Sequence, residues 1–507
     1  MRPSVIKISI TQLSRTLGHK QRYHSLRGSS QALALQRNSL FYFSNIFSRR
    51  SPLFLSTLRK PLTPQRFISQ ATPTMETRIV KVPTKGSLGH FRSGNGLAKL
   101  DSWEINHENN AALKALEDAA HELRTTDTPV AFPTETVYGL GADATRTLSV
   151  KGIYSAKGRP SDNPLISHVC DLDMLRQYIG HTDETQDPIP ERYRALIERF
   201  WPGPLTILLP NPVPSKLAPE VTAGLKTFGV RMPSSPLALS LIKLAGVPLA
   251  APSANASTKP SPTAAQHVKD DLDGRIELIL DGGHCHVGVE STVVDGLCDP
   301  PVVLRPGGIG IDELRTCPGW ENVTIAYKDK SEEGKAAPRA PGMKYKHYSP
   351  KATVVLYESS FKKGGDGIAL FDFETASETV NGHTTNGDRK RRKIGVIRTQ
   401  RWKSGAGLRC ANFHHLTDVQ AADEQDDSPF QVYEGDLLDD KEQVIGTILD
   451  IDLGRGTEGI ARGLFAALRE FDRRGADTIF VDGIDDKSDI AAAVMNRLRK
   501  AASETRD

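Results

Sequence analysis

Short apolar segments alternate with Pro- and Gly-marked turns along most of this 507-residue chain, and the alternation narrows the fold to the mixed α/β class. Stretches with apolar residues at helical spacing lie between these segments. We predict one α/β domain over residues 105–315. Its predicted strands are Val130–Phe132, Leu205–Leu209, Gly229–Arg231, Val247–Ala250, Ile276–Leu280 and Val302–Leu304. Its predicted helices are Asn109–Leu123, Leu148–Ala156, Pro190–Phe200, Pro236–Ala245 and Ala264–Asp270.

A second α/β domain is predicted over residues 351–502, after a break in this pattern. Residues 316–350 include a Lys-, Glu- and Pro-containing stretch that is typical of a linker. Residues 361–393 are expected to form a surface insertion. Alternating strands and helices predict a small parallel-sheet domain. The predicted strands are Ala352–Tyr357, Ile394–Ile397 and Thr478–Val481, and the predicted helices are Gly459–Arg474 and Ile490–Ala502.

The first 75 residues differ in charge from the rest of the chain. They contain 12 Lys and Arg and no Asp or Glu, and they are rich in Ser, Leu and Phe. A basic, Ser-rich, acid-free start is typical of a mitochondrial transit peptide; the alternative is a disordered basic tail. A second start at Met75 would give a cytosolic form. We therefore expect a cytoplasmic protein with a mitochondrial form.

The remaining chain is mildly acidic, which bears on its partners. Without the 12 cations, 53 Lys and Arg face 61 Asp and Glu, a net charge of −8. This balance gives no broad basic surface for nucleic acid. The basic run Arg389–Lys393 is either a nuclear or nucleic-acid signal or a solvated loop. No apolar run is as long as a membrane helix, so we expect no membrane association.

Metal and disulfide chemistry find little support in the sequence. The five cysteines are scattered without the spacing of a metal site or a disulfide framework, which suits a reducing compartment. His284 and His286 flank Cys285, but no partner cluster has ligand spacing. No metal ligands are therefore predicted.

Two dense polar segments suggest a nucleotide-using enzyme. Pro133–Gly141 follows a buried apolar run and concentrates Thr, Gly and Tyr, as ligand-binding loops often do. Lys157–Leu165 places two cations, a carboxylate and an amide in one Pro-bounded loop. Lys157 and Arg159 could stabilise a triphosphate and the charge that develops at phosphorus, although a solvated surface turn has the same composition.

Three later motifs are plain individually. Pro252–Asn255 offers small residues for close backbone approach, Gly288–Asp295 carries a hydroxyl pair, and Leu304–Gly308 sets an Arg beside a tight turn. Simple turns or helix caps would explain each of them. The chain contains neither a Walker A sequence nor a Gly-rich dinucleotide fingerprint.

In this order and spacing the motifs resemble those of the YrdC-type threonylcarbamoyl-AMP synthases. The resemblance is to the two-domain long form of fungal-like eukaryotic members, because the run Pro341–Pro350 separates that form from single-domain relatives. It implies a YrdC-like catalytic domain with a mixed twisted sheet and a smaller Rossmann-like α/β domain. The matching segments are Pro133–Gly141, Lys157–Leu165, Pro252–Asn255, Ser291–Asp295 and Arg305–Gly307.

The resemblance implies a specific reaction. Family members convert L-threonine, bicarbonate and ATP into threonylcarbamoyl-adenylate and pyrophosphate. A separate threonylcarbamoyl transferase, of the KEOPS type or its mitochondrial counterpart, then modifies adenosine 37 of tRNAs that read codons beginning with A. Such chemistry depends on placement and charge stabilisation, and Mg²⁺ is expected with ATP.

The resemblance also assigns site residues. Lys157 and Arg159 would act on the phosphate charge, and Tyr345 would make the linker a lid over the nucleotide, although a simple tether is the alternative. The implied L-threonine site is Thr136, His168, Arg231, Ala251 and Ser291. The implied ATP site is Arg159, Asn163, Thr227, Ser253, Ser261, Arg305 and Tyr345.

Two other functions remain as alternatives. An RNA- or tRNA-binding module without adenylate-forming activity would fit a cation-lined face on the second domain, and weak tRNA contact stays open for the enzyme as well. The acidic charge of the body and the lack of an aromatic stacking motif count against the module as the main role. A carbamoyl-adenylate enzyme of hydrogenase maturation would carry upstream zinc-finger segments, and this sequence has none.

Overall fold

The computed structural model describes residues 75–84, 86–108, 110–180, 186–327, 347–361, 367–368, 392–416, 428–487 and 490–507. Residues 1–74 of the predicted targeting segment, Tyr345 and most of the predicted insertion lie outside these residues. Within them, every helix is too short or too polar to cross a lipid bilayer.

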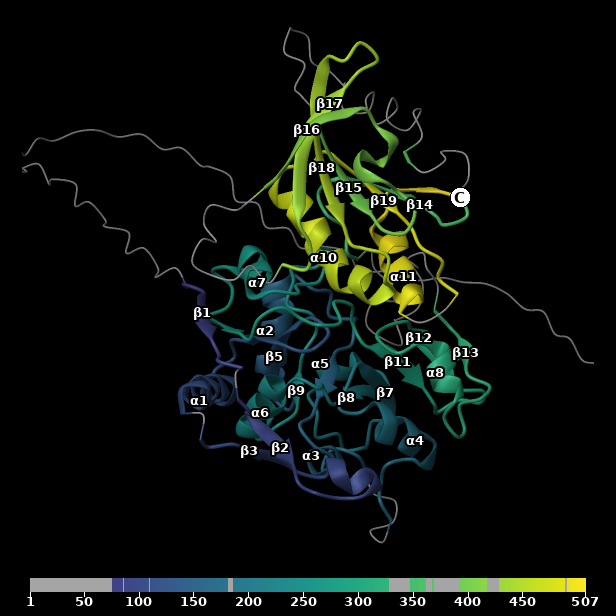
Figure 1. The fold of residues 1–507 in the computed structure, drawn as a ribbon. Coiled ribbons are helices and arrows are strands. Elements are labelled where there is room, and N and C mark those ends of the chain that lie inside the picture. The colour runs from purple at the N-terminus through teal and green to yellow at the C-terminus, as the bar shows by residue number, and fades with distance from the viewer. Residues whose placement is uncertain are drawn as a thin grey trace, which may run out of the picture. The chain divides into compact units, whose positions relative to one another are not determined.

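One eleven-stranded sheet organises the first domain (Figure 1). Its strand order is β1-β10-β4-β5-β9-β6-β8-β7-β11-β12-β13, and parallel and antiparallel pairs are mixed along it. This confirms the mixed sheet implied by the family resemblance. A separate two-stranded sheet pairs β2 (Gly89–Phe91) with β3 (Trp103–Ile105). The large sheet contains β1 (Arg78–Lys81), β4 (Val130–Pro133), β5 (Tyr138–Asp143), β6 (Ile166–His168), β7 (Leu205–Pro210), β8 (Thr227–Arg231), β9 (Leu249–Ala250), β10 (Leu278–Asp281), β11 (Thr292–Asp295), β12 (Val302–Arg305) and β13 (Thr324–Ile325).

The five helices predicted for this domain are present to within a few residues, as α1, α2, α4, α6 and α7, whereas α3, α5, α8 and η1 were not predicted. Helix α6 (Pro236–Ala245) has the predicted bounds because Ser235 caps its N-terminus and Gly246, with φ of 70°, ends it. The other helices are α1 (Asn110–Thr125), α2 (Thr147–Lys157), α3 (Leu172–Arg176), α4 (Glu191–Phe200), α5 (Pro219–Thr222), α7 (Ala265–Leu272), α8 (Ile311–Arg315) and the 3₁₀ helix η1 (Gly96–Leu100).

The polar segment after β4 is not entirely a loop. Its second half is strand β5, which pairs antiparallel with β4 and then with β9. A side chain at Gly141 would lie 2.6 Å from the ring of Phe132, so glycine at this position leaves room for that ring beside the paired strands. The turn between β4 and β5, from Thr134 to Val137, is what remains of the predicted loop.

The second domain has a seven-stranded sheet in the order β16-β17-β18-β15-β19-β14-β20. The prediction of a parallel sheet was wrong for one edge, because β16, β17 and β18 pair antiparallel. Helices α10 (Thr457–Arg473) and α11 (Ala491–Ala501) lie against this sheet (Figure 1). The strands are β14 (Thr353–Tyr357), β15 (Arg392–Arg398), β16 (Cys410–His415), β17 (Val432–Leu438), β18 (Val444–Asp452), β19 (Thr478–Asp482) and β20 (Glu504–Arg506), and a 3₁₀ helix, η3, covers Ser404–Gly407.

The predicted domain bounds need three adjustments. Strand β1 pairs with β10, so the sheet of the first domain begins at Arg78, before the predicted start at residue 105. Strand β13 pairs with β12, so the catalytic sheet continues to Ile325, beyond the predicted start of the linker. Strand β15 begins at Arg392, inside the predicted insertion, because Arg392 and Lys393 pair with β18. The first residues of the predicted linker and the last residues of the predicted insertion therefore belong to the two sheets.

Helix α10 packs on the catalytic domain beside the segment that precedes β11. A side chain at Gly288 would lie 2.4 Å from the carbonyl oxygen of Ala461, so only glycine fits there. Val137 and Val289 of the first domain share one apolar cluster with Phe465 and other residues of the second. The two domains therefore pack directly against each other beside the turn after β4 and the segment before β11.

Candidate active site

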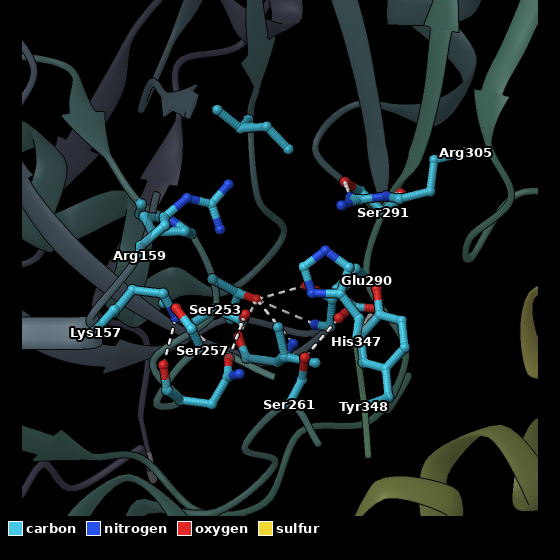
Figure 2. Close-up of a pocket in the computed structure, with 18 of the residues that line it drawn as sticks. Lys157, Arg159, Ser253, Ser257, Ser261, Glu290, Ser291, Arg305, His347 and Tyr348 are labelled. Carbon is cyan, nitrogen blue, oxygen red and sulfur yellow. Dashed lines mark hydrogen bonds between the residues drawn. The ribbon is translucent and has the colours of Figure 1, made fainter. Parts of the chain in front are cut away.

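A single pocket gathers most of the polar motifs (Figure 2). The pocket opens to solvent, and the empty space in it and its mouth amounts to about 760 Å³. In Figure 2, Lys157 and Arg159 lie on one side, and Ser291, Arg305, Glu290, His347 and Tyr348 on the other. The walls come from the turn after β4, the end of α2, strands β6 and β8, the turn after β9, the segment before β11, the end of β12, and the residues just before β14.

Arg231, at the end of β8, is a buried cation fixed by three hydrogen bonds. Its Nη1 donates to Thr136 Oγ1 at 2.9 Å, its Nη2 to Glu135 Oε1 at 2.5 Å, and its Nε to Gly203 O at 3.0 Å. These bonds use three of the five guanidinium donors. The remaining donors suit a carboxylate held in the pocket.

Neutral hydrogen-bonding groups line the pocket near Arg231. Burial, reinforced by the charge of Arg231, lowers the pKa of His168 to about 3, so its ring is neutral at physiological pH. Ser291 Oγ lies 2.8 Å from Thr206 Oγ1 and accepts from Arg305 Nη2 at 3.0 Å. This part of the pocket can therefore bind a small ligand through one anionic group and one hydroxyl.

Lys157 is tied to the protein backbone. Its Nζ donates to the carbonyl oxygens of Ser253 and Asn255. Burial, and repulsion from Arg159, hold its pKa well below the usual value. Ser253 Oγ donates to Asn255 Oδ1 at 2.5 Å, which completes the turn. Lys157, which the sequence analysis assigned to the phosphate charge, thus holds the turn after β9 in place.

Arg159 is better placed for an anion. Gly158 ends helix α2 in the left-handed conformation, with φ of 60°, and turns the chain away from the helix axis. Arg159 follows directly, lines the pocket, and donates from Nη2 to Pro164 O at 3.2 Å.

Arg305, at the end of β12, supplies a second cation on the opposite wall. Its Nε and Nη2 donate to Ser291 O at 3.1 and 2.9 Å. Burial lowers its pKa to about 10, so it stays protonated at neutral pH. Together with Arg159 and Arg231, it gives the pocket three guanidinium groups.

The structure brings together most of the residues that the sequence singled out. Asn163 and Thr227 are exceptions: neither lines the pocket, and Thr227 faces a separate small cavity that Pro164 and Leu165 also line. Tyr345 lies outside the described residues. The predicted residues that line the pocket are Thr136, Lys157, Arg159, His168, Arg231, Ala251, Ser253, Ser261, Ser291 and Arg305.

Several lining residues were not assigned a role from the sequence. Thr134 positions Thr136, with its Oγ1 2.8 Å from Thr136 Oγ1. Glu290, His347 and Tyr348 also line the pocket. All of them lie within segments that the sequence analysis singled out. The signals that could have identified them are a carboxylate beside Ser291 and a His-Tyr pair near the end of the predicted linker.

Comparison with known proteins identifies the family. The family profile described as "Telomere recombination" (Sua5/YciO/YrdC) matches residues 122–307, and the profile described as "Threonylcarbamoyl-AMP synthase, C-terminal domain" matches residues 309–503. The threonylcarbamoyl-AMP synthase of Schizosaccharomyces pombe is 42% identical over 448 residues, which cover 85% of this chain and 98% of that protein. The Bacillus subtilis enzyme is 42% identical over 74% of this chain and 89% of its own length.

Solved structures agree with the sequence relatives. The crystal structure of Pyrococcus abyssi Sua5 complexed with L-threonine has a TM-score of 0.59 and 35% identity, covering 85% of this chain and 100% of that one. A variant of the same protein gives a TM-score of 0.60. The family and two-domain form implied by the motifs are confirmed, and this chain belongs to the threonylcarbamoyl-AMP synthase family.

Proposed function

We propose that the chain makes threonylcarbamoyl-AMP from L-threonine, bicarbonate and ATP, releasing pyrophosphate. The observation that carries this proposal is one pocket with three arginines, Arg159, Arg231 and Arg305, beside neutral hydrogen-bonding groups. Such a lining suits an amino acid and a polyphosphate bound side by side.

L-Threonine would occupy the part of the pocket around Arg231. The free guanidinium donors of Arg231 would hold the carboxylate, and the hydroxyls of Thr136 and Ser291 would select a hydroxylated side chain. His168 would act as a neutral hydrogen-bonding group, and the small side chain of Ala251 would leave room for the substrate.

ATP would occupy the wall formed by Arg159, Ser253, Ser261 and Arg305. We retain Tyr345 as a predicted nucleotide contact, since the neighbouring His347 and Tyr348 line the pocket. Asn163 and Thr227 could contact ATP only after a rearrangement of their segments, so we assign them no role here.

The chemical step would be an in-line displacement at phosphorus. The threonine amine and bicarbonate first form an N-carboxylate with loss of water. A carboxylate oxygen then bonds to the α-phosphorus as the bond to the bridging oxygen breaks, and pyrophosphate leaves with the electron pair. Arg159 and Arg305 would stabilise the charge that develops, and the pocket would hold the reactants in place.

Mg²⁺ would arrive with ATP. Among the described residues, no group of three or more His, Cys, Asp or Glu side chains could hold a metal ion. The pocket carboxylate of Glu290 is paired with Arg497. The ion would therefore be held by the phosphates, whose charge it would neutralise.

Pyrophosphate release tests the function. The chain starting at Met75 would be assayed with ATP, Mg²⁺ and bicarbonate, and with L-threonine, L-serine or no amino acid. Release that needs both L-threonine and bicarbonate supports the proposal. Release without L-threonine, or no release while tRNA raises the unfolding temperature, would favour the nucleic-acid-binding alternative.

Two wider roles follow from the sequence. The adenylate would be consumed by a threonylcarbamoyl transferase acting on tRNA. Residues 1–75 would send part of the protein to mitochondria, while chains starting at Met75 would stay in the cytosol. A fluorescent protein fused to residues 1–75 should enter mitochondria, and a diffuse signal would contradict this.

A further inference from the structure

The second domain reaches into the wall of the pocket through one buried arginine. Arg497, on helix α11, is 0% exposed. Its Nε and Nη2 both donate to Glu290 Oε2 at 3.0 Å, and its Nη1 donates to Pro306 O. Both acceptors belong to the catalytic domain and flank Ser291 and Arg305 along the chain.

Glu290 connects Arg497 to the nucleotide side of the pocket. Its other oxygen, Oε1, accepts a 2.5 Å hydrogen bond from Ser261 Oγ. Burial alone would raise the pKa of Glu290, but the charges of Arg497 and Arg305 outweigh burial and hold it at about 2. The carboxylate is therefore ionised and fixed between the second domain and a residue that we assign to ATP.

A purely stabilising role explains this arrangement poorly. Removing two charges from water costs about as much as their attraction returns, and an apolar pair of similar volume often stabilises a fold equally well or better. Arg497 also lies over the ring of Tyr348, with its Cζ 5.8 Å from the ring centroid. Its contacts thus converge on residues that line the pocket.

We propose that Arg497 is a positioning residue for the nucleotide site: it holds Glu290, and through Glu290 it orients the Ser261 hydroxyl. The second domain is then a working part of the site in addition to any role as an anchor for the linker. The inference rests on the proposed function, since it takes the wall around Ser261 to bind ATP.

The test compares Arg497→Met with Arg499→Met in the otherwise complete chain. Arg499 lies on the same helix and is also paired with carboxylates, but its partners Glu358 and Asp486 belong to the second domain. Arg497→Met should raise KM for ATP and lower kcat/KM for ATP about 10- to 100-fold, as loss of a supporting contact does. KM for L-threonine should change less. Arg499→Met should lower the unfolding temperature without changing KM for ATP.

A double-mutant cycle separates this role from simple packing. If Arg497 acts through Glu290, then Glu290→Gln combined with Arg497→Met should be no worse than the more harmful single change. Arg497→Lys, which keeps the charge but not the fork of donors, should lie between Met and the unchanged chain. If Arg497→Met does not fold, Arg497→Lys and Glu290→Gln carry the test, because both keep the volume of the side chain.

Calorimetric titration with ATP makes the result independent of turnover. If the unchanged chain binds ATP but releases no pyrophosphate with L-threonine, the proposed reaction fails and the ATP affinities of the variants still decide the role of Arg497. Equal ATP affinity in the unchanged chain, Arg497→Lys and Glu290→Gln would overturn the inference, as would equal changes in Arg497→Met and Arg499→Met.

Discussion

Gly307→Ala should disable the pocket through the backbone alone. Gly307 follows Arg305 and Pro306 at the end of β12. A Cβ at this position would lie 2.1 Å from Thr292 N, 2.2 Å from the carbonyl carbon of Ser291 and 2.4 Å from Glu290 O. Ordinary contacts between such atoms begin near about 3.5 Å, so one backbone segment must move by about 1 Å. No rotation of a side chain can relieve the clash.

The displaced segment carries the Ser291 hydroxyl and the carbonyl that Arg305 holds. Misplacing a substrate-positioning group by about 1 Å can lower a rate about 10²-fold, which corresponds to about 2.7 kcal/mol of transition-state stabilisation. We expect kcat/KM for L-threonine to fall by about that factor. Pyrophosphate release measured against L-threonine at saturating ATP gives this number directly.

Gly459→Ala is the matched control for this substitution. Gly459 lies on an exposed face of α10, where the nearest atom to an added Cβ is Leu453 O at 3.4 Å. Alanine inside a helix should stabilise the chain by about 0.5–1 kcal/mol and leave the kinetics unchanged. If Gly307→Ala keeps kcat/KM within about twofold of the unchanged chain, the claim that close backbone packing positions Ser291 is refuted.

Three further changes test other parts of the molecule. Arg159→Ala should lower kcat/KM for ATP about 10²- to 10³-fold at an unchanged unfolding temperature, because it removes a cation from the phosphate wall; a normal KM for ATP would contradict this assignment. Lys157→Met should lower stability by about 1–3 kcal/mol, since the carbonyls of Ser253 and Asn255 lose a buried donor; a rate loss without a stability loss would return Lys157 to direct phosphate contact. Acid should weaken the fold as pH falls from 6.5 toward 3, because burial holds three histidine pKa values at about 3 and only the unfolded chain binds those protons in this range. Equal unfolding temperatures at pH 7 and pH 5 would argue against that burial. The three histidines are His168, His267 and His347.

Elements with strong local signals were predictable from the sequence. Helix α6 carries a Ser cap, a first-turn Pro and a terminal Gly, and its predicted and observed bounds agree. Strand β6, Ile166–His168, was missed because three residues are too short to show a period. Its place is set by its partners β8 and β9, which lie far away in the sequence.

The antiparallel edge of the second domain was missed for a different reason. Strand β16, Cys410–His415, is largely exposed, so it lacks the apolar alternation that marks a half-buried strand. It is held by backbone pairing with β17, and β17 in turn pairs with β18. Register between strands of this kind is a property of the assembled sheet.

The site residues also differ in how far the sequence alone could predict their roles. The family resemblance assigned Arg231 and Ser291 to L-threonine and Arg305 to ATP. In the structure all three line one pocket, because each ends or directly precedes a strand of the sheet. The sequence could not assign Lys157 to the backbone of Ser253, since a lysine beside a Gly-Arg pair looks the same whether it faces phosphate or carbonyl oxygens. Burial decides between the two, and burial depends on the folded chain.

The pairing of Glu290 with Arg497 shows why the two domains are best treated as one active unit. The partners are separated by 207 residues, so no local pattern links them. Without Arg497, Glu290 would keep the hydrogen bond from Ser261 and the nearby charge of Arg305, but its ionised form would lose its largest stabilising charge. A protonated Glu290 could donate to Ser261 instead of accepting from it, which would reverse the hydrogen bond at the nucleotide wall. The second domain therefore supplies the largest of the charges that keep this pocket carboxylate ionised.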